Sequence, residues 1–112
     1  MLRNICLVAG LATMLGAPVS AADQDLIGDA ERGAELAAEH CVRCHDITED
    51  GAFKTYPPSF ASIAVYRPDD QIFARIYFPQ MHNAMPEFSW YLQREGVEDL
   101  VAYIRSLERP ID

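Results

Sequence analysis

The sequence predicts a small all-α domain. Three stretches have the composition and apolar spacing of helices, at residues 29–40, 69–77 and 95–107, and a shorter helix is expected at residues 59–65. No stretch alternates apolar and polar residues over the length of a strand, and the chain has no internal repeat. Three to four helices are therefore expected.

The first helix has a start signal and one unusual residue. Asp29 is a suitable N-cap and Glu31 suits the first turn, where acidic side chains favour the helix dipole. Alanines make the rest a good helix former, but Gly33 in the interior costs about 1 kcal/mol relative to alanine. We expect another helix to approach closely there.

Residues 46–66 contain Gly51, Pro57 and Pro58 and are predicted to be mostly loop around the short helix. The next helix begins with Pro68 at or near its first position and ends before Pro79. It carries two apolar pairs four residues apart, Ile72 with Ile76 and Phe73 with Tyr77.

The last helix has one apolar face with helical spacing. That face consists of Val97, Leu100, Val101, Ile104 and Leu107. Glu98 and Asp99 fall early and Arg105 late, as the helix dipole prefers. Tyr103 lies beside the face and is placed to cover Gly33, with an ordinary half-buried tyrosine as the alternative.

The segment from Cys41 to His45 has the spacing C-x-x-C-H, which is typical of c-type haem attachment. The Cys41 and Cys44 thiols would bond one haem, and the His45 imidazole would take one axial position on its iron. A zinc site would need a second pair of ligands, and no second pair of cysteines follows. A redox disulfide would need a βαβ setting, whereas the segment before Cys41 is predicted to be helical.

Residues 1–22 have the features of a secretory signal peptide. Arg3 precedes an apolar run at residues 5–15, which is shorter than the about 20 residues of a membrane-spanning helix, and small residues follow it. We expect cleavage after Ala21 or Ala22 and export to a bacterial periplasm. An uncleaved anchor or a lipid on Cys6 is the alternative, but Cys6 lies near the start of the apolar run rather than at its end.

Cleavage would leave residues 23–112 as one domain, without stable insertion in the membrane. A domain of this size is usually only marginally stable without a cross-link or a bound group, and a covalent haem would add stability. The chain has 9 basic and 17 acidic residues, a net charge of −8 that becomes −9 without Arg3. This charge excludes nucleic-acid binding and favours solubility or steering toward a positively charged protein patch.

The candidates for the second axial ligand are Met81, His82 and Met85. Met85 fits best, because Pro86 biases it toward an extended backbone and Phe88 offers an apolar ring to shield the haem. Met81 is instead expected to pack, and His82 is the main competitor. His40 is expected to be an exposed surface residue.

With these residues, the chain resembles the class I c-type cytochromes. The resemblance rests on Gly33, the C-V-R-C-H motif, P-P-S-F at 57–60, M-P-E-F at 85–88 and the ending D-L-V-A-Y-I-R-S-L at 99–107. It implies a cytochrome c fold around one covalently bound haem, with amino- and carboxy-terminal helices that cross beside it.

The resemblance also implies roles for single residues. Gly33 and Tyr103 match the small residue and the aromatic where the terminal helices cross, and Tyr103 is expected beside the haem with Phe88. Pro58 matches the proline whose carbonyl accepts a hydrogen bond from the ligating histidine, here His45, with Pro57 as the second choice.

The chain departs from the family at two places. Residues 89–96 lack the usual start of the last helix, and Trp90 and Tyr91 are expected to pack under the loop, with a haem-edge or docking role as the alternative. Lys54 is the only lysine, so the partners of the lysine-rich mitochondrial protein are not expected.

These features predict a periplasmic carrier that passes single electrons to redox partner proteins through Fe(III)/Fe(II) cycling with His45 and Met85 as ligands. It would not be an enzyme, and no catalytic residue is expected. A haem subunit of a periplasmic dehydrogenase is the alternative, followed by a ligand-binding haem sensor and, remotely, a structural zinc protein.

Overall fold

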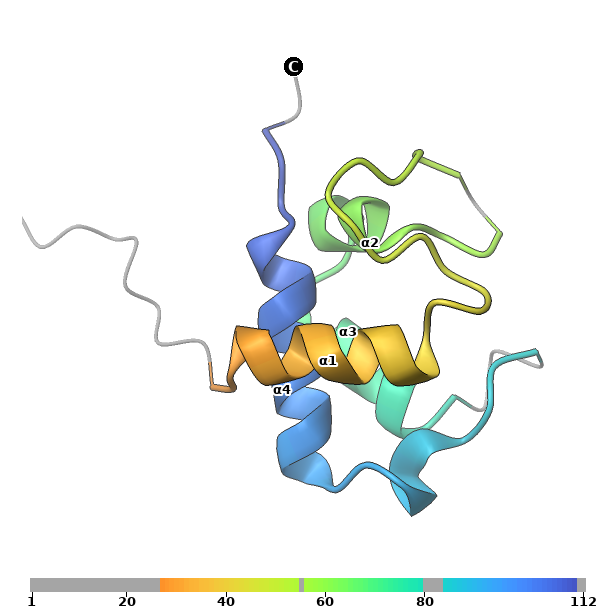
Figure 1. Cartoon of the computed structure of the whole chain (residues 1–112), viewed down its shortest axis with the longest axis vertical. Helices are drawn as coiled ribbons and strands as arrows, with labels where there is room; N and C mark the ends of the chain where they lie inside the picture. Colours follow the sequence, from red (N-terminus) through yellow and green to blue (C-terminus); the bar gives the residue numbers. More distant parts are fainter. Residues whose placement is uncertain (1–26, 55, 80–83, 111–112) are drawn as a thin grey trace, which may run out of the picture.

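Two helices from opposite ends of the chain cross at the centre of the structure (Figure 1). They are α1 (Ala30–His40) and α4 (Arg94–Ser106), in a computed structural model that describes residues 27–54, 56–79 and 84–110. Their crossing contributes more contacts than any other pair of elements. It positions α1, and the C-x-x-C-H segment begins where that helix ends.

Three shorter elements complete the fold. They are α2 (Phe60–Tyr66), α3 (Asp69–Tyr77) and the 3₁₀ helix η1 (Phe88–Trp90). The described residues contain no strand, and the all-α prediction is confirmed. The predicted helices are found within a residue at each end; Pro68 occupies the N-cap of α3, one position before the first helical residue.

Gly33 lies where α1 meets α4, as its place inside a helix predicted. A Cβ atom there would overlap the carbonyl oxygen of Asp99 and lie 2.7 Å from Tyr103 Cβ. The obstacle is backbone, which cannot turn aside as a side chain can. Only glycine allows the two helices this approach.

A buried carboxylate holds the crossing at its polar end. Asp99 is 4% exposed and accepts hydrogen bonds from the Asp29 backbone N–H at 2.7 Å and from Arg32 Nε and Nη2 at 3.0 and 3.1 Å. Asp29 is also the N-cap of α1, as predicted. The Arg32 hydrogen bonds lower the pKa of Asp99, with further help from the Asp29 N–H and against the opposing effect of burial.

Arg105 ties α4 to the connection between α2 and α3. Its guanidinium donates to the carbonyl oxygens of Ala64 and Arg67, at 2.5 and 2.6 Å, and to Asp69 Oδ1 at 2.7 Å. Two of these acceptors lie at the end of α2, where helix carbonyls lack partners within the helix. The last turn of α4 therefore positions both middle helices.

The apolar face predicted for α4 forms the centre of the core. Val97, Leu100 and Ile104 are at most 1% exposed, and Val101 is buried beside them. α1 contributes Ala37, α2 contributes Phe60 and Ala64, and α3 contributes Ile72 and Ile76. Among the helices that the structure describes, none is long and apolar enough to cross a bilayer.

The segment before α4 differs from the expectation. It contains the unpredicted η1, in which Phe88 is buried, and the packing expected for Trp90 and Tyr91 is wrong: these side chains are 81% and 73% exposed. Leu92, next in sequence, is the residue that packs into the core. Phe88 and Leu92 lie four residues apart and both face the core, which leaves Trp90 and Tyr91 between them on the outside.

The Gly33 contact makes a sharp stability prediction. Gly33→Ala should lower the free energy of unfolding by roughly 1–3 kcal/mol in urea titration, because the methyl group meets backbone. Gly96→Ala is the matched control, since its Cβ would lie 3.6 Å from its nearest neighbours and alanine favours helix by up to about 1 kcal/mol. Equal effects of the two substitutions would contradict the close crossing.

The lowered pKa of Asp99 predicts how stability depends on pH. Because the folded pKa lies below the unfolded value of about 4, the carboxylate stabilises the fold above that pH, and the contribution is lost as pH falls through the folded pKa. Asp99→Asn should cost on the order of 1–3 kcal/mol near pH 7, with a smaller difference at acid pH. Asp70→Asn, on exposed α3 surface, is the control; a constant difference across pH would refute this role.

Candidate haem-binding site

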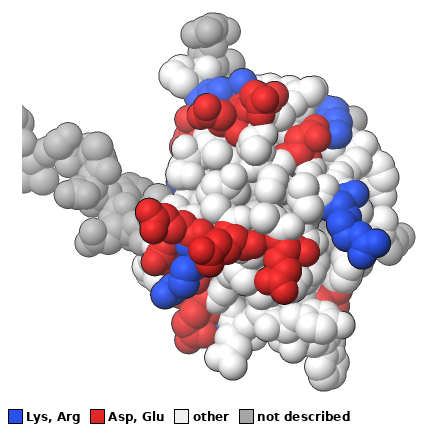
Figure 2. Space-filling view, in the orientation of Figure 1, with Lys and Arg blue, Asp and Glu red and all other residues white. Residues whose placement is uncertain are grey.

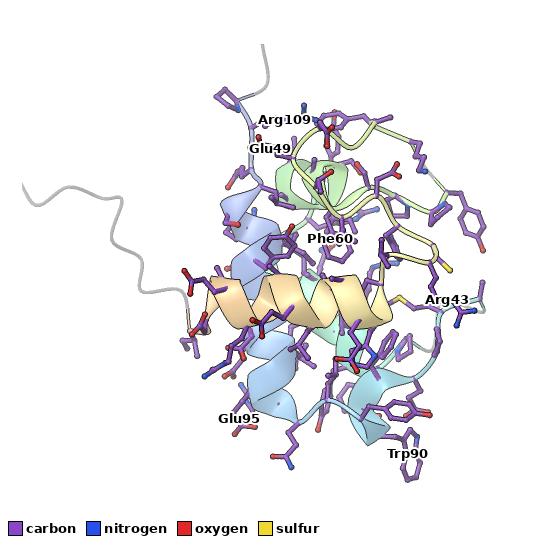
Figure 3. The ribbon with its side chains drawn as sticks, viewed as in Figure 1. Arg43, Glu49, Phe60, Trp90, Glu95 and Arg109 are labelled. Carbon is purple, nitrogen blue, oxygen red and sulfur yellow. The ribbon has the colours of Figure 1, made fainter. Side chains whose placement is uncertain are left out.

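A cavity of about 670 Å³ lies between the C-x-x-C-H segment, α2, α3 and residues 84–88. Its volume lies within the range of roughly 300–1,000 Å³ that small-molecule and cofactor sites occupy. Most of the wall is apolar, with contributions from Phe60, Ile72, Ile76, Phe88 and Ile104. Phe60 lies between α1 and α2, toward the centre of the molecule (Figure 3).

The two motif cysteines line this cavity from the end of α1. Cys41 is the C-cap of the helix, and its carbonyl accepts from the N–H groups of Cys44 at 3.2 Å and His45 at 3.0 Å. This turn brings both thiols and the imidazole to one wall. Both thiols are free, Cys41 buried and Cys44 exposed.

The environment of Cys41 does not resemble that of a redox-active thiol. Burial, with a smaller effect from Cys44, raises the pKa of Cys41 to about 11. Reactive cysteines usually have a lowered pKa, since the thiolate is the nucleophile. Before haem attachment, the Cys41 thiol would therefore stay protonated near neutral pH.

His45 is held by a backbone carbonyl. Its Nδ1 lies 2.7 Å from the carbonyl oxygen of Pro58, and its ring lies 5.5 Å from the Phe60 ring, centroid to centroid. A proton on Nδ1 makes this contact a hydrogen bond and leaves the Nε2 lone pair free for a metal. Of the two prolines considered, Pro58 makes this contact.

The segment after α3 brings a thioether to the same cavity. Met85 is half-buried and lines the cavity together with Ala84, Pro86 and Phe88. Phe88 is 7% exposed. Met81 and His82, the other candidate ligands, lie outside the described residues.

Two residues lie elsewhere than the sequence suggested. His40, expected on the exposed surface, lines the cavity with its side chain 26% exposed and its ring 6.1 Å from that of Phe88. Tyr103 is not part of the cavity wall; its hydroxyl donates to the Ile47 carbonyl oxygen at 2.8 Å. The centroid of its ring is 6.3 Å from that of Phe60, which does line the cavity. Tyr103 therefore contacts a wall residue and the loop after the motif without lining the cavity itself.

Three arginines of the wall, Arg43, Arg67 and Arg75, were not identified from the sequence. One signal for Arg75 was available. It lies three residues after Ile72, so its exposed side chain stands beside the apolar face of α3.

The chemistry of these side chains fits a c-type haem. Two thiols can form the covalent bonds, imidazole and thioether groups are haem-iron ligands, and the apolar wall suits the macrocycle. Guanidinium groups suit the two carboxylates that haem carries. The two thiols, the imidazole, the thioether and the three guanidinium groups all belong to residues that line this cavity.

Comparisons with known proteins agree with this chemistry. A family model described as "Cytochrome C oxidase, cbb3-type, subunit III" matches residues 28–104. Cytochrome c-552 of Bradyrhizobium diazoefficiens is 38% identical over 108 residues, which cover 95% of this chain and 94% of that protein. No solved structure gives a significant match.

The matched region includes the C-x-x-C-H motif, Met85, the helices α1, α2, α3 and η1, and α4 except for its last two residues. The family match covers more than half of the chain, and the relative is similar along nearly its whole length. The chain belongs to the c-type cytochromes, as a small monohaem member that carries electrons on one covalently bound haem.

Proposed function

We propose that Cys41 and Cys44 bond the haem, that His45 and Met85 are its axial ligands, and that the protein carries single electrons in the periplasm. The observation that supports this proposal most is the convergence of both thiols, the His45 imidazole and the Met85 thioether on one cavity. These groups come from two segments about forty residues apart, on either side of α2 and α3.

The bound haem supplies an iron that cycles between Fe(III) and Fe(II). The His45 Nδ1–H donates a hydrogen bond to the carbonyl oxygen of Pro58, which orients the ring and raises the donor strength of Nε2. Met85 adds a neutral sulfur ligand, and neutral ligands within an apolar wall favour the ferrous state and a fairly high potential. With both positions filled, the iron would not readily bind a substrate, as suits an electron carrier.

Export is proposed from residues 1–22, which carry the signal-peptide pattern and lie outside the described residues. Cleavage after Ala21 or Ala22 would remove Cys6, leaving the two motif thiols for the haem.

A free carrier is favoured over a fixed subunit. The matched family model is described as an oxidase subunit, which supports a role within a larger complex. Against this, the name of cytochrome c-552 of Bradyrhizobium diazoefficiens describes no complex, and that protein aligns along 94% of its chain. A haem sensor is disfavoured because Met85 lines the cavity and is available to close the second axial position.

Replacing Met85 tests the ligand assignment. Met85→Ala should abolish the weak long-wavelength sulfur-to-iron absorption band of the ferric protein and let the ferrous protein bind carbon monoxide. Met81→Ala and His82→Ala are matched controls that should keep the band. A Met85→Ala protein that retains the band would move the assignment to Met81, and loss of low-spin ligation only in His82→Ala would assign His82.

A further inference from the structure

His40 lines the cavity but takes no part in the proposed haem ligation. It is the last residue of α1, directly before Cys41, and its side chain is 26% exposed. The centroid of its ring lies 6.1 Å from that of Phe88, which follows Met85 by three residues. His40 therefore adjoins both segments that would supply the axial ligands.

Among the described residues that line the cavity, His40 is the one whose charge can change near neutral pH once haem is bound. Cys41 and Cys44 would be thioethers, and His45 would be an iron ligand. No Asp or Glu is part of this described wall. Tyrosine and arginine side chains ordinarily ionise well above neutral pH, whereas histidine does so between about pH 5 and 8. The remaining ionisable residues of the wall are of those two types: Tyr56, Arg43, Arg67 and Arg75.

The helix that carries His40 favours a positive charge on its ring. Glu39 Oε2 lies 3.8 Å from His40 Nε2, and the carboxyl end of α1 is the negative end of the helix dipole. Glu39 also ends a ridge of exposed carboxylates with Glu31 and Glu35, which Figure 2 shows as an acidic band across the front of the molecule. These groups all stabilise the imidazolium over the neutral ring.

The other elements around the cavity act in both directions. Glu87 is exposed next to Phe88 and favours the imidazolium. α4 contributes only the apolar Ile104 to the wall. Positive charges disfavour the imidazolium, and they come from the motif, the C-cap of α2 and α3: Arg43, Arg67 and Arg75. The charge of the haem iron would be added to this set.

We propose that His40 binds a proton more tightly when the haem iron is Fe(II) than when it is Fe(III), so that the reduction potential of this cytochrome falls as pH rises through the titration of His40. The proposal rests on the electron-carrier function above. An electron added to the iron makes the haem more negative by one charge, which favours a cation on a wall residue of the same cavity.

The coupled step balances in charge and atoms. Fe(III) takes one electron from the redox partner protein and becomes Fe(II), and a ring nitrogen of His40 takes a proton, on average a fraction of one, from water. Oxidation returns the electron to a partner and the proton to water. The partly exposed side chain gives His40 the solvent access that this exchange requires.

The haem carboxylates are the other groups that could titrate with electron transfer. Arg67 and Arg75 line the cavity, and guanidinium groups beside those carboxylates would keep them ionised. Carboxyl groups also ordinarily titrate near pH 4, below the range of histidine. A pH dependence centred near neutral pH therefore indicates an imidazole.

The expected change in proton affinity between the two redox states is roughly two- to tenfold. Coulomb's law gives about this range for two unit charges about 10 Å apart near a protein surface. Because a tenfold change in an equilibrium constant equals 59 mV for a one-electron couple, the potential should fall by about 20 to 60 mV across the whole titration.

The first test is a redox titration of the holoprotein at a series of pH values between about 5 and 9. The unmutated protein should show this fall, and His40→Gln should abolish it, because glutamine keeps a polar side chain that does not titrate. His82→Gln is the matched control and should keep the fall. A fall that persists in His40→Gln would overturn the proposal and assign the proton to a haem carboxylate, or to His82 if only His82→Gln removes it.

The second test observes the proton directly. In NMR titrations of the intact holoprotein, the Cε1–H signal of His40 should titrate at a higher pH in the ferrous than in the ferric form, by the same two- to tenfold change in affinity. Equal midpoints in the two forms would overturn the proposal, even if the potential depends on pH.

Two further outcomes separate this role from a change of ligand and from the carrier function. The sulfur-to-iron band of the ferric protein should persist across the titration, and its loss over the same pH range would show ligand exchange and overturn the role of His40. A potential that does not depend on pH would also overturn that role while leaving the carrier function intact. Absence of a reversible one-electron transition at every pH would instead contradict the carrier function itself.

Discussion

The close crossing of α1 and α4 at Gly33 is the constraint on which the rest of the structure depends. The absence of a side chain lets the helices approach, and Asp99 closes the polar end of the contact with Arg32 and the Asp29 N–H. Because α1 ends in the turn at Cys41, this contact also determines where the haem-binding segment begins. α4 then supplies Ile104 to the cavity and, through Arg105, positions the two middle helices.

Most of the helical fold could be predicted because local signals agreed with packing. Asp29 caps α1 and the face from Val97 to Ile104 is buried, both as the pattern indicated. The 3₁₀ helix η1 could not be predicted, since three residues are too few to show a period. For that reason Trp90 and Tyr91 were expected inside, and they lie on the surface.

Some residues of the site could also be predicted from local sequence, whereas others depend on how the helices are arranged in space. The motif at Cys41 to His45 identifies its own chemistry by spacing, and proline stiffening singles out Met85. The role of His40 and the three arginines depends on which elements meet in space, and sequence spacing does not encode that. Arg75 is the partial exception, because it lies beside the apolar face that Ile72 and Ile76 form. The arginines of the cavity wall can therefore be identified only once α2 and α3 are placed beside the motif.

The central claim is that one haem, closed on both sides by His45 and Met85, passes single electrons. The most direct measurement is an optical redox titration of the purified holoprotein, followed by addition of carbon monoxide to the ferrous form. The account predicts one reversible one-electron transition and no carbon monoxide binding. Immediate binding of carbon monoxide by the unmutated ferrous protein would contradict it, because an open iron site belongs to a sensor or an enzyme.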